Sequence, residues 1–277
     1  MRKSSSRITF SAEGSRRVFG GQSYSGSSFF EFLRMDHPDL VPEFGNLDWG
    51  QVQIPHGTTV LGLVYEDGAL IAGDRLATEG YQVATRDIEK VYKVDDHAAI
   101  AIAGAAGPAI EMVNVFRLEL EHYEKLEGQV LGFEGKANRL SFLVRQNLPA
   151  AMQGLVVMPM FVGYDLKNAK GRIYKFDITG GRFAETDYYA TGSGGKDARS
   201  SLKKTFRSSG FTRNAAIEAA VEALMDAADE DRGTGGFDTN RGIYPTCKLA
   251  TRVGVEDVSE KEMLQCFERV NERLKAA

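Results

Sequence analysis

The order of the expected elements predicts an α+β fold in which two sheets pack face to face and helices cover their outer sides. Three observations carry this prediction. Alternating segments form two strand hairpins within residues 58–104, helical periodicity follows twice, and strands then return before two further helices. We see no repeat and no interdomain linker after residue 57, so residues 58–277 are expected to form one domain.

The first half of this body combines two hairpins with two helices. "TTVLGLVY" alternates and meets "GALIAGD" at the turn Glu66-Asp67-Gly68, and "KVYKV" and "AAIAIAG" repeat the arrangement. Apolar residues then recur at helical spacing until Gly128. Strands are expected at 58–65, 68–74, 90–94 and 98–104, and helices at 107–126 and 136–152.

The second half returns to strands and ends in helices. "MPMFVGYD", "GRIYKFD" and "DYYATG" predict three strands, and "YPTCKLATRV" predicts a late one. The corresponding ranges are 158–165, 171–177 and 187–192 for strands, 196–207 and 212–228 for helices, 244–253 for the late strand and 259–274 for a terminal helix.

Composition excludes several function classes. Hydrophobic residues make up 43% and charged residues 26% of the 277, which is typical of a globular protein, and the net charge of −4 argues against nucleic-acid binding. No apolar run approaches the ~18 residues of a membrane span. Two cysteines form no disulfide framework, and four scattered histidines lack metal-ligand spacing. We expect a cytoplasmic protein with no metal, cofactor or membrane partner.

Residues 1–57 differ in composition from the body. The first 28 residues hold nine serines and five basic residues but only one acid, Glu13, and they lack the apolar stretch of a secretory signal. A transit peptide is disfavoured by the acids in "SSFFEFLRMDHPDLVPEF" (27–44), which predicts a short helix capped by Ser28 with Glu31 three residues on. This segment is either a surface helix of the main fold or part of a removable pro-segment, and we favour the pro-segment.

The junction "IPHGTTV" (54–60) leads from this segment into the first strand. A threonine hydroxyl is a weak nucleophile, but a threonine at a chain terminus carries its own base, an α-amine with a pKa of about 7.7–8.0. Gly57 would suit a cleavage point, because it has no side chain and tolerates strained angles. Taken alone, however, Thr58 and Thr59 are also ordinary strand residues.

Two ionisable residues follow at equal intervals. Asp74 lies sixteen residues after Thr58, and Lys90 sixteen after Asp74. Strand ends can converge in a hairpin fold, so an Asp–Lys pair could place positive charge beside Thr58 and favour the neutral amine and the alkoxide. Alternatively, both are solvated strand ends. "IAGAAG" (102–107), which leads into a helix, is either an oxyanion hole or a tight turn.

Two glycine-rich stretches do not carry a ligand motif. "TGSGGKD" (191–197) has Ala190 and Asp197 where a phosphate loop needs Gly and Ser or Thr, which excludes that motif. "DEDRGTGGFD" (229–238) lacks the ligand spacing of an EF-hand and is interpreted as a helix cap and loop.

Several motifs in register resemble proteasome beta subunits of the actinobacterial type. They are "HGTTV", "AGDRLATEG", "RDIEKVY", "IAGAAG", "LELEHYEKLEG", "NLPAAMQGLVVMP" and "DAADEDRGTGG", and "SSFFEFLRMDHPDLVP" is similar to the bacterial beta propeptide. The resemblance covers most of the chain and outweighs the ordinary interpretation of Thr58. It implies the four-layer αββα sandwich of N-terminal-nucleophile hydrolases, with residues 1–57 as a propeptide and 58–277 as the catalytic domain.

The resemblance also implies residue roles. Thr58, freed by autocleavage after Gly57, would be the nucleophile, with its amine accepting the proton through a water molecule. Lys90, paired with Asp74, would ease deprotonation, and the Gly104 N–H would stabilise the oxyanion. The remaining matches are Ser193, Asp231 and Thr234 around the amine, Thr78 with Gly104 along the substrate backbone, and Ala77, Ile88, Tyr92, Ile102 and Ala106 in the specificity pocket. Thr234 is often Ser in the family. The apolar pocket predicts cleavage after apolar residues.

The resemblance further implies an assembly and its partners: heptameric beta rings, two of them stacked, with alpha subunits outside, a ring ATPase acting through the alpha ring, and unfolded or tagged polypeptides as substrates. Two alternative functions compete with this one. A non-catalytic ring-forming beta subunit usually lacks the nucleophile or the lysine, and this chain keeps both. A stand-alone N-terminal-nucleophile amidohydrolase would not need the family's leader.

Overall fold

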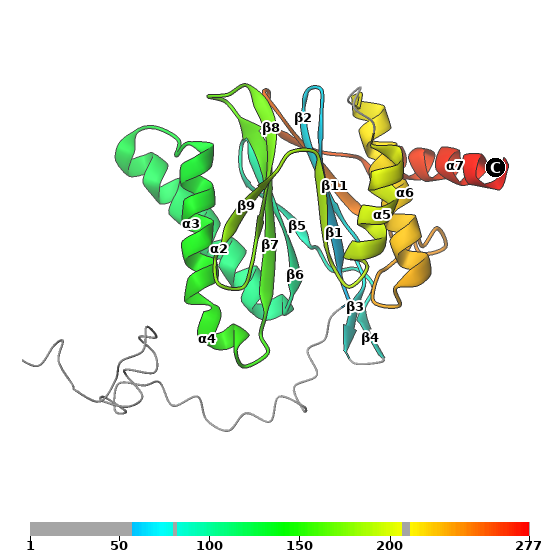
Figure 1. Ribbon diagram of the computed structural model, residues 1–277, viewed down its shortest axis with the longest axis horizontal. Helices are drawn as coiled ribbons and strands as arrows, with labels where there is room; N and C mark the ends of the chain where they lie inside the picture. The colour runs from blue at the N-terminus through cyan, green and yellow to red at the C-terminus, as the bar shows by residue number, and fades with distance from the viewer. Residues whose placement is uncertain (1–56, 80–81, 207–210, 277) are drawn as a thin grey trace, which may run out of the picture. The chain divides into compact units, whose positions relative to one another are not determined.

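The computed structural model describes residues 57–79, 82–206 and 211–276. In these residues two five-stranded antiparallel sheets lie face to face between two layers of helices (Figure 1). The predicted α+β class and αββα sandwich are confirmed. The expected helix after Ser28 lies outside the described residues, and the removal of residues 1–57 stays a prediction.

The first sheet carries the start of the body. Its strand order is β10-β1-β2-β11-β12, and helices α5, α6 and α7 pack on its outer side. The bounds are β1 (Thr59–Tyr65), β2 (Gly68–Gly73), β10 (Tyr188–Gly192), β11 (Thr246–Thr251), β12 (Val255–Asp257), α5 (Gly195–Thr205), α6 (Arg213–Glu230) and α7 (Glu260–Ala276).

The second sheet has the order β5-β6-β7-β8-β9, and α2 and α3 cover it. Its elements are β5 (Val91–Asp95), β6 (Ala98–Gly104), β7 (Val157–Asp165), β8 (Lys170–Phe176), β9 (Arg182–Glu185), α2 (Ala106–Glu127), α3 (Phe133–Gln146) and the short α4 (Leu148–Ala151). A separate hairpin pairs β3 (Ala77–Glu79) with β4 (Gln82–Thr85).

Strand β6 is buried on both of its faces. Side chains alternate across a strand, and Ile100 and Ile102 pack among the residues of α2 and α3, whereas Ala99 and Ala101 pack between the two sheets. A strand buried on both sides needs apolar residues at every position, which is the pattern of "AAIAIAG".

The structure differs from the sequence-based expectation in two respects. The predicted helix 136–152 is two helices, because α3 ends at Gln146 and Pro149 stands in the first turn of α4. The short strands β3, β4, β9 and β12 were not predicted. They lie at sheet edges or in the separate hairpin, and every side chain of β4 is exposed, so they lack the half-buried alternation that identifies a strand.

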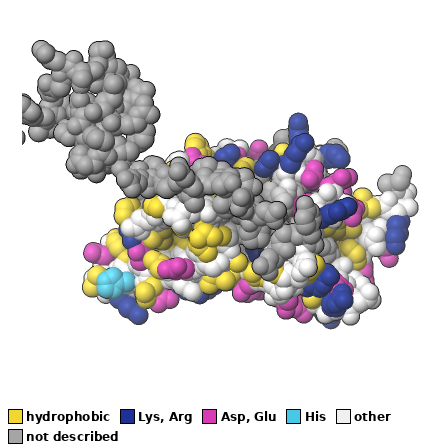
Figure 2. Space-filling view, turned by 90° about the horizontal axis from the view of Figure 1, so that it is seen from below, with side chains coloured by type: hydrophobic (Ala, Val, Ile, Leu, Met, Phe, Trp, Pro, Cys, Tyr) yellow, Lys and Arg dark blue, Asp and Glu magenta, His cyan; other side chains and the backbone are white. Residues whose placement is uncertain are grey.

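None of the helices in the described part of the chain combines the length and the apolar character needed to cross a bilayer. On the face drawn in Figure 2, basic and acidic side chains are interspersed among hydrophobic ones. The described side chains drawn there form no continuous field of one charge.

Candidate active site

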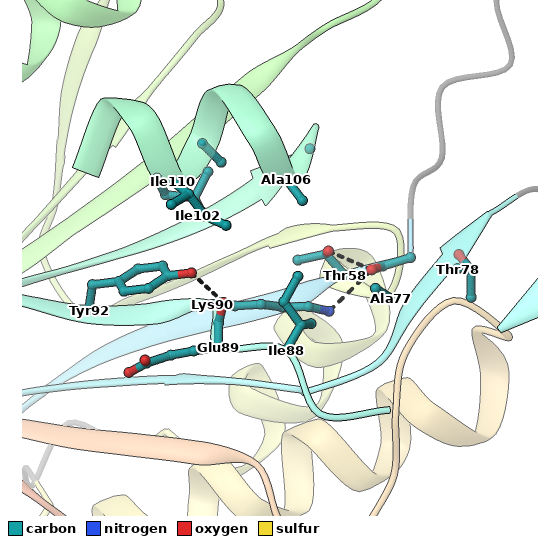
Figure 3. A pocket seen from close by; sticks show the side chains of 13 residues that line it. Thr58, Ala77, Thr78, Ile88, Glu89, Lys90, Tyr92, Ile102, Ala106 and Ile110 are labelled. Carbon is teal, nitrogen blue, oxygen red and sulfur yellow. Dashed lines mark hydrogen bonds between the residues drawn. The ribbon is translucent and has the colours of Figure 1, made fainter. Parts of the chain in front are cut away.

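Thr58 lies directly before β1 and is only 7% exposed. Its hydroxyl Oγ1 donates a hydrogen bond of 2.5 Å to the carbonyl oxygen of Gly57. The Lys90 ammonium nitrogen Nζ lies 3.1 Å from the same oxygen (Figure 3). The carbonyl oxygen of Gly57 therefore accepts hydrogen bonds from both the Thr58 hydroxyl and the Lys90 ammonium.

Lys90 and Asp74 form a buried ion pair, the arrangement that the resemblance implied. The Lys90 Nζ donates to Asp74 Oδ1 at 2.7 Å and to the Leu76 carbonyl at 2.6 Å, in addition to Gly57. Lys90 is 6% exposed and Asp74 is 0% exposed. Burial lowers the pKa of Lys90, and the charge of Asp74 partly opposes this. Three oxygen acceptors nevertheless require three N–H groups, which only the ammonium form has.

Asp74 is held by the backbone as well as by Lys90. It follows the end of β2, where its own N–H bonds the Thr59 carbonyl. Its carboxylate accepts from the N–H groups of Thr59 at 2.8 Å, Leu76 at 3.0 Å and Gly235 at 2.8 Å. Together with Lys90, these donors supply the hydrogen bonds that a carboxylate removed from water needs.

The nitrogen of Thr58 faces a second polar cluster. Its N–H donates to Ser193 Oγ at 3.3 Å, and the Ser193 hydroxyl hydrogen-bonds the carboxylate of Asp231. Thr234 Oγ1 donates to the same carboxylate at 2.5 Å, and the Gly233 N–H donates to it at 3.1 Å. These three residues therefore come together, as the resemblance implied. Ser193 directly follows β10, Asp231 caps the end of α6, and Thr234 lies in the loop after that helix.

Gly104 ends β6 and lines the same pocket as Thr58. Its φ of +121° lies in the region that favours glycine, and an added Cβ would stand 2.1 Å from the Val156 carbonyl oxygen. Glycine is required here for the approach of the two strands. The role of its N–H as oxyanion donor stays a prediction.

A small pocket opens beside Thr58. All six predicted substrate-contacting residues line it: Ala77, Thr78, Ile88, Tyr92, Ile102 and Ala106. In Figure 3, Ile102, Ala106 and Ile110 lie on one side of the pocket and Ile88 on the other. Its walls are largely apolar.

Sequence reasoning missed three further lining residues, Glu89, Ala109 and Ile110. A signal for Ile110 existed: it stands four residues after Ala106 in α2, hence on the same helix face. The side chain of Ile110 is 42% exposed, although its helical spacing is the same as that of the buried residues Val113, Phe116 and Leu120. Sequence reasoning also missed the hydroxyl of Thr59, which lies in the polar cluster. Among the described residues, no group of three His, Cys, Asp or Glu side chains could hold a metal ion.

Comparison with known proteins places this site in a family. A model described as "Proteasome subunit" matches residues 54–239, a span that contains every predicted site residue. The chain belongs to the proteasome subunit family. The "Proteasome subunit beta" of Acidimicrobium ferrooxidans is 46% identical over 263 residues, which is 95% of this chain and 93% of that protein. That of Rhodococcus erythropolis strain PR4 is 49% identical over 264 residues, 91% and 88% of the two chains.

A third proteasome relative, "Proteasome subunit beta" of Acidothermus cellulolyticus, is 47% identical over 252 residues, 88% of this chain and 86% of that protein. All three are beta subunits matched over most of both chains. This chain is therefore a proteasome subunit of the beta type, and its family is one of proteases. The resemblance to actinobacterial proteasome beta subunits is confirmed.

Proposed function

We propose that this chain is a threonine-type endopeptidase whose nucleophile is Thr58, armed by autocleavage of the bond between Gly57 and Thr58. One observation carries the proposal: the Thr58 hydroxyl and the Lys90 ammonium both contact the carbonyl oxygen of Gly57. A buried cation on a carbonyl oxygen favours the negative charge that develops there during attack.

The autocleavage step uses only groups of this chain and water. Thr58 Oγ attacks the carbonyl carbon of Gly57, and Lys90 stabilises the negative oxygen. The C–N bond then breaks, the hydroxyl proton ends on the nitrogen, and Gly57 is left as an ester on Oγ. Water hydrolyses this ester, which releases residues 1–57 with a Gly57 carboxylate and leaves Thr58 with a free amine.

The free amine then serves as the base for substrates. It accepts the Oγ proton through a water molecule, and general-base catalysis of this kind contributes roughly 10²–10⁴-fold. Oγ attacks the substrate carbonyl carbon, the departing peptide takes the proton, and water hydrolyses the ester on Thr58. Lys90 with Asp74 eases deprotonation of Oγ, Gly104 donates its N–H to the oxyanion, and Ser193, Asp231 and Thr234 orient the amine.

The pocket supports cleavage after apolar residues. Ile88, Ile102 and Ile110 offer hydrocarbon surface to the side chain that precedes the cut. Thr78 and Gly104 would hold the substrate backbone as an added strand. The enclosing assembly we propose has heptameric beta rings, two stacked, between rings of alpha subunits. A ring ATPase would deliver unfolded or tagged polypeptides in the cytoplasm.

Mass spectrometry tests the mechanism directly. The intact mass and N-terminal residue of the subunit, isolated from its assembly with alpha subunits, should correspond to residues 58–277. Trp49 is the single tryptophan, so leader removal should also abolish indole fluorescence. Thr58→Ala should retain the leader and show no peptide hydrolysis. Full activity in that variant, or a retained leader in the active particle, would refute the proposal and favour a different nucleophile.

A further inference from the structure

Thr59 has a hydroxyl that a plain strand position does not need. The residue is 0% exposed, and its backbone N–H donates to Asp74 at 2.8 Å. Its Oγ1 lies 2.6 Å from Thr234 Oγ1 and accepts the Gly194 N–H at 3.0 Å. Thr59 therefore bonds Asp74 through its backbone N–H, and through its side chain it bonds Thr234, which in turn bonds Asp231.

The direction of these hydrogen bonds follows from counting hydrogens. A carboxylate can only accept hydrogen bonds, so Thr234 donates its one hydroxyl hydrogen to Asp231. The hydrogen between Thr59 and Thr234 must then come from Thr59. The bonds run in one sense, from the Gly194 N–H to Thr59, from Thr59 to Thr234, and from Thr234 to Asp231.

These bonds close a ring on the reactive residue. The N–H of Thr58 donates to Ser193, whose hydroxyl contacts Asp231. From Asp231 the bonds lead back through Thr234 to Thr59, which is covalently joined to Thr58. The bonds that connect the Thr58 nitrogen to Asp231 through Ser193 thus return to the very next residue of the chain.

We propose that Thr59 is a positioning residue for the reaction, whose hydroxyl holds Thr234 so that Asp231 and Ser193 are aimed at the nitrogen of Thr58. The proposal rests on the threonine-protease function proposed above. Thr59 touches no reacting atom and acts only through these neighbours.

The ring also has an electrostatic consequence in the cleaved enzyme. The charged groups that hydrogen bonds connect to Thr58 and Thr59 are Asp231, Asp74 and Lys90. A negative Asp231 favours the protonated amine, and hydrogen bonds donated toward it reduce that influence. Thr59 donates to Thr234 and not to Asp231 itself, so its hydroxyl acts by holding the Thr234 donor in place. Without it the Thr234 bond to Asp231 should weaken, which should raise the pKa of the Thr58 amine and leave more of it protonated and inactive as a base near neutral pH.

Two substitutions at position 59 separate the hydroxyl from the shape of the side chain. Thr59→Val removes the hydroxyl but keeps the branched form, and Thr59→Ser does the reverse. We would assemble each full-length chain with alpha subunits and measure leader removal, kcat and KM for a peptide with an apolar residue before the cut, and kcat/KM against pH. Thr59→Val should lower kcat roughly ten- to hundredfold with little change in KM and move the acid limb to higher pH. Thr59→Ser should stay close to the parent in both.

Matched variants guard against a purely structural loss. Thr205→Val removes a threonine hydroxyl at the far end of α5 and should leave the pH profile unchanged. Thr234→Val breaks the ring one bond further on and should reproduce the acid-limb shift. If Thr59→Val removes its leader too slowly for kcat to be measured, the rate of leader removal is compared with that of Thr59→Ser instead, because the ring exists with Gly57 still attached.

Two results would overturn the proposal: a Thr59→Val enzyme with parental kcat and pH profile, or equal losses in Thr59→Val and Thr59→Ser, which would point to packing. Neither affects the proposed protease function while Thr58→Ala stays inactive. Activity of Thr58→Ala would instead refute that function itself.

Discussion

Two carboxylates flank the start of β1, and they are held in different ways. Asp74 pairs with the Lys90 ammonium, and three backbone N–H groups fill its remaining acceptor positions. Asp231 instead accepts from two hydroxyl groups, those of Ser193 and Thr234, and from one backbone N–H. Asp74 is held by an opposite charge and by backbone groups whose positions are fixed. Asp231 is held mainly by hydroxyl groups, which can rotate about their C–O bonds.

The difference corresponds to the atoms of Thr58 that each side reaches. Asp74 holds Lys90 against the Gly57 carbonyl, beside the hydroxyl of Thr58, where negative charge would develop. Asp231 reaches the nitrogen through Ser193, and that nitrogen would change from amide to amine on cleavage. A hydroxyl can donate or accept, so it can serve the nitrogen in both forms. Fixed charge suits the first task and adaptable hydrogen bonding the second.

The largest difference between the two arrangements should appear when Lys90, the partner of Asp74, is replaced and when Asp231 itself is replaced. Lys90→Met should slow leader removal and peptide hydrolysis by about 10²–10⁴-fold, because the Gly57 carbonyl loses its cation. It also leaves Asp74 buried and unpaired, which should lower the free energy of unfolding by about 3 kcal/mol. Asp231→Asn should cost less on both counts. Rates from intact mass and thermal melting of each variant check this, and equal losses would erase the distinction.

The pH dependence of leader removal tests the charge of Lys90. Its pKa is lowered by burial, so it should lose its proton at a pH below the ordinary value of 10.5 for lysine. The neutral amine cannot serve three acceptors, and cleavage should slow as the pH rises through the lowered pKa. Between the lowered pKa and the ordinary one, the unfolded chain binds more protons at Lys90 than the folded chain does. Lys90 therefore makes the free energy of unfolding rise with pH in this range, so loss of folding would not explain slower cleavage.

Lys90→Arg is the matched variant for this experiment, because a guanidinium remains charged in proteins. Whatever its overall rate, its leader removal should lack the alkaline decline. Rates of cleavage at Thr58 between pH 7 and 10, with circular dichroism to verify folding, would decide the matter. A decline of the same shape in both variants would assign the titration to another group.

Gly57 lies between the two sides, and its substitution should have a smaller effect. A Cβ there would come within 2.5 Å of Thr78 Oγ1 and 2.6 Å of the Gly233 carbonyl oxygen. Gly57→Ala should therefore slow leader removal about tenfold, through strain of the order of 1–3 kcal/mol. Once cleaved, the enzyme should match the parent in kcat and KM, since residue 57 has left. A lasting change in kcat would contradict this explanation.

The smallest effect is expected for Thr234→Ser. The hydroxyl that donates to Asp231 is kept, and only a buried methyl group is lost. Stability should fall by about 0.8 kcal/mol, with kcat and the pH profile close to the parent. Thermal melting and peptide hydrolysis measure both. A shifted pH profile in the Ser variant would mean that the methyl group, and not only the hydroxyl, orients Asp231.

Local patterns allowed much of this fold to be predicted, and their failures have physical causes. Strands β1, β2 and β6 were recognised because burial on one or both faces dictates side-chain type at each position. The exposed strand β4 lacks that constraint, and Pro149 divided a helix whose spacing alone looked continuous. In the site, the helical spacing from Ala106 could have identified Ile110, which was missed. Glu89 gave no signal, because an acid in a loop before a strand is common on surfaces.

The sequence by itself indicated the α+β class with two sheets packed face to face, because strand alternation and helical spacing are local. Its motifs, through their resemblance to a family, implied a junction at Gly57 and Thr58 and a pair of Asp74 with Lys90. Only the tertiary structure decided that Ser193 would meet Thr58 across 135 residues and that Thr234 would meet Thr59 across 175. Those contacts arise where β10 pairs with β1 and the loop after α6 comes back over it. No local pattern specifies the packing of such distant segments, so the direction of the hydroxyl bonds around Thr59 became readable only in three dimensions.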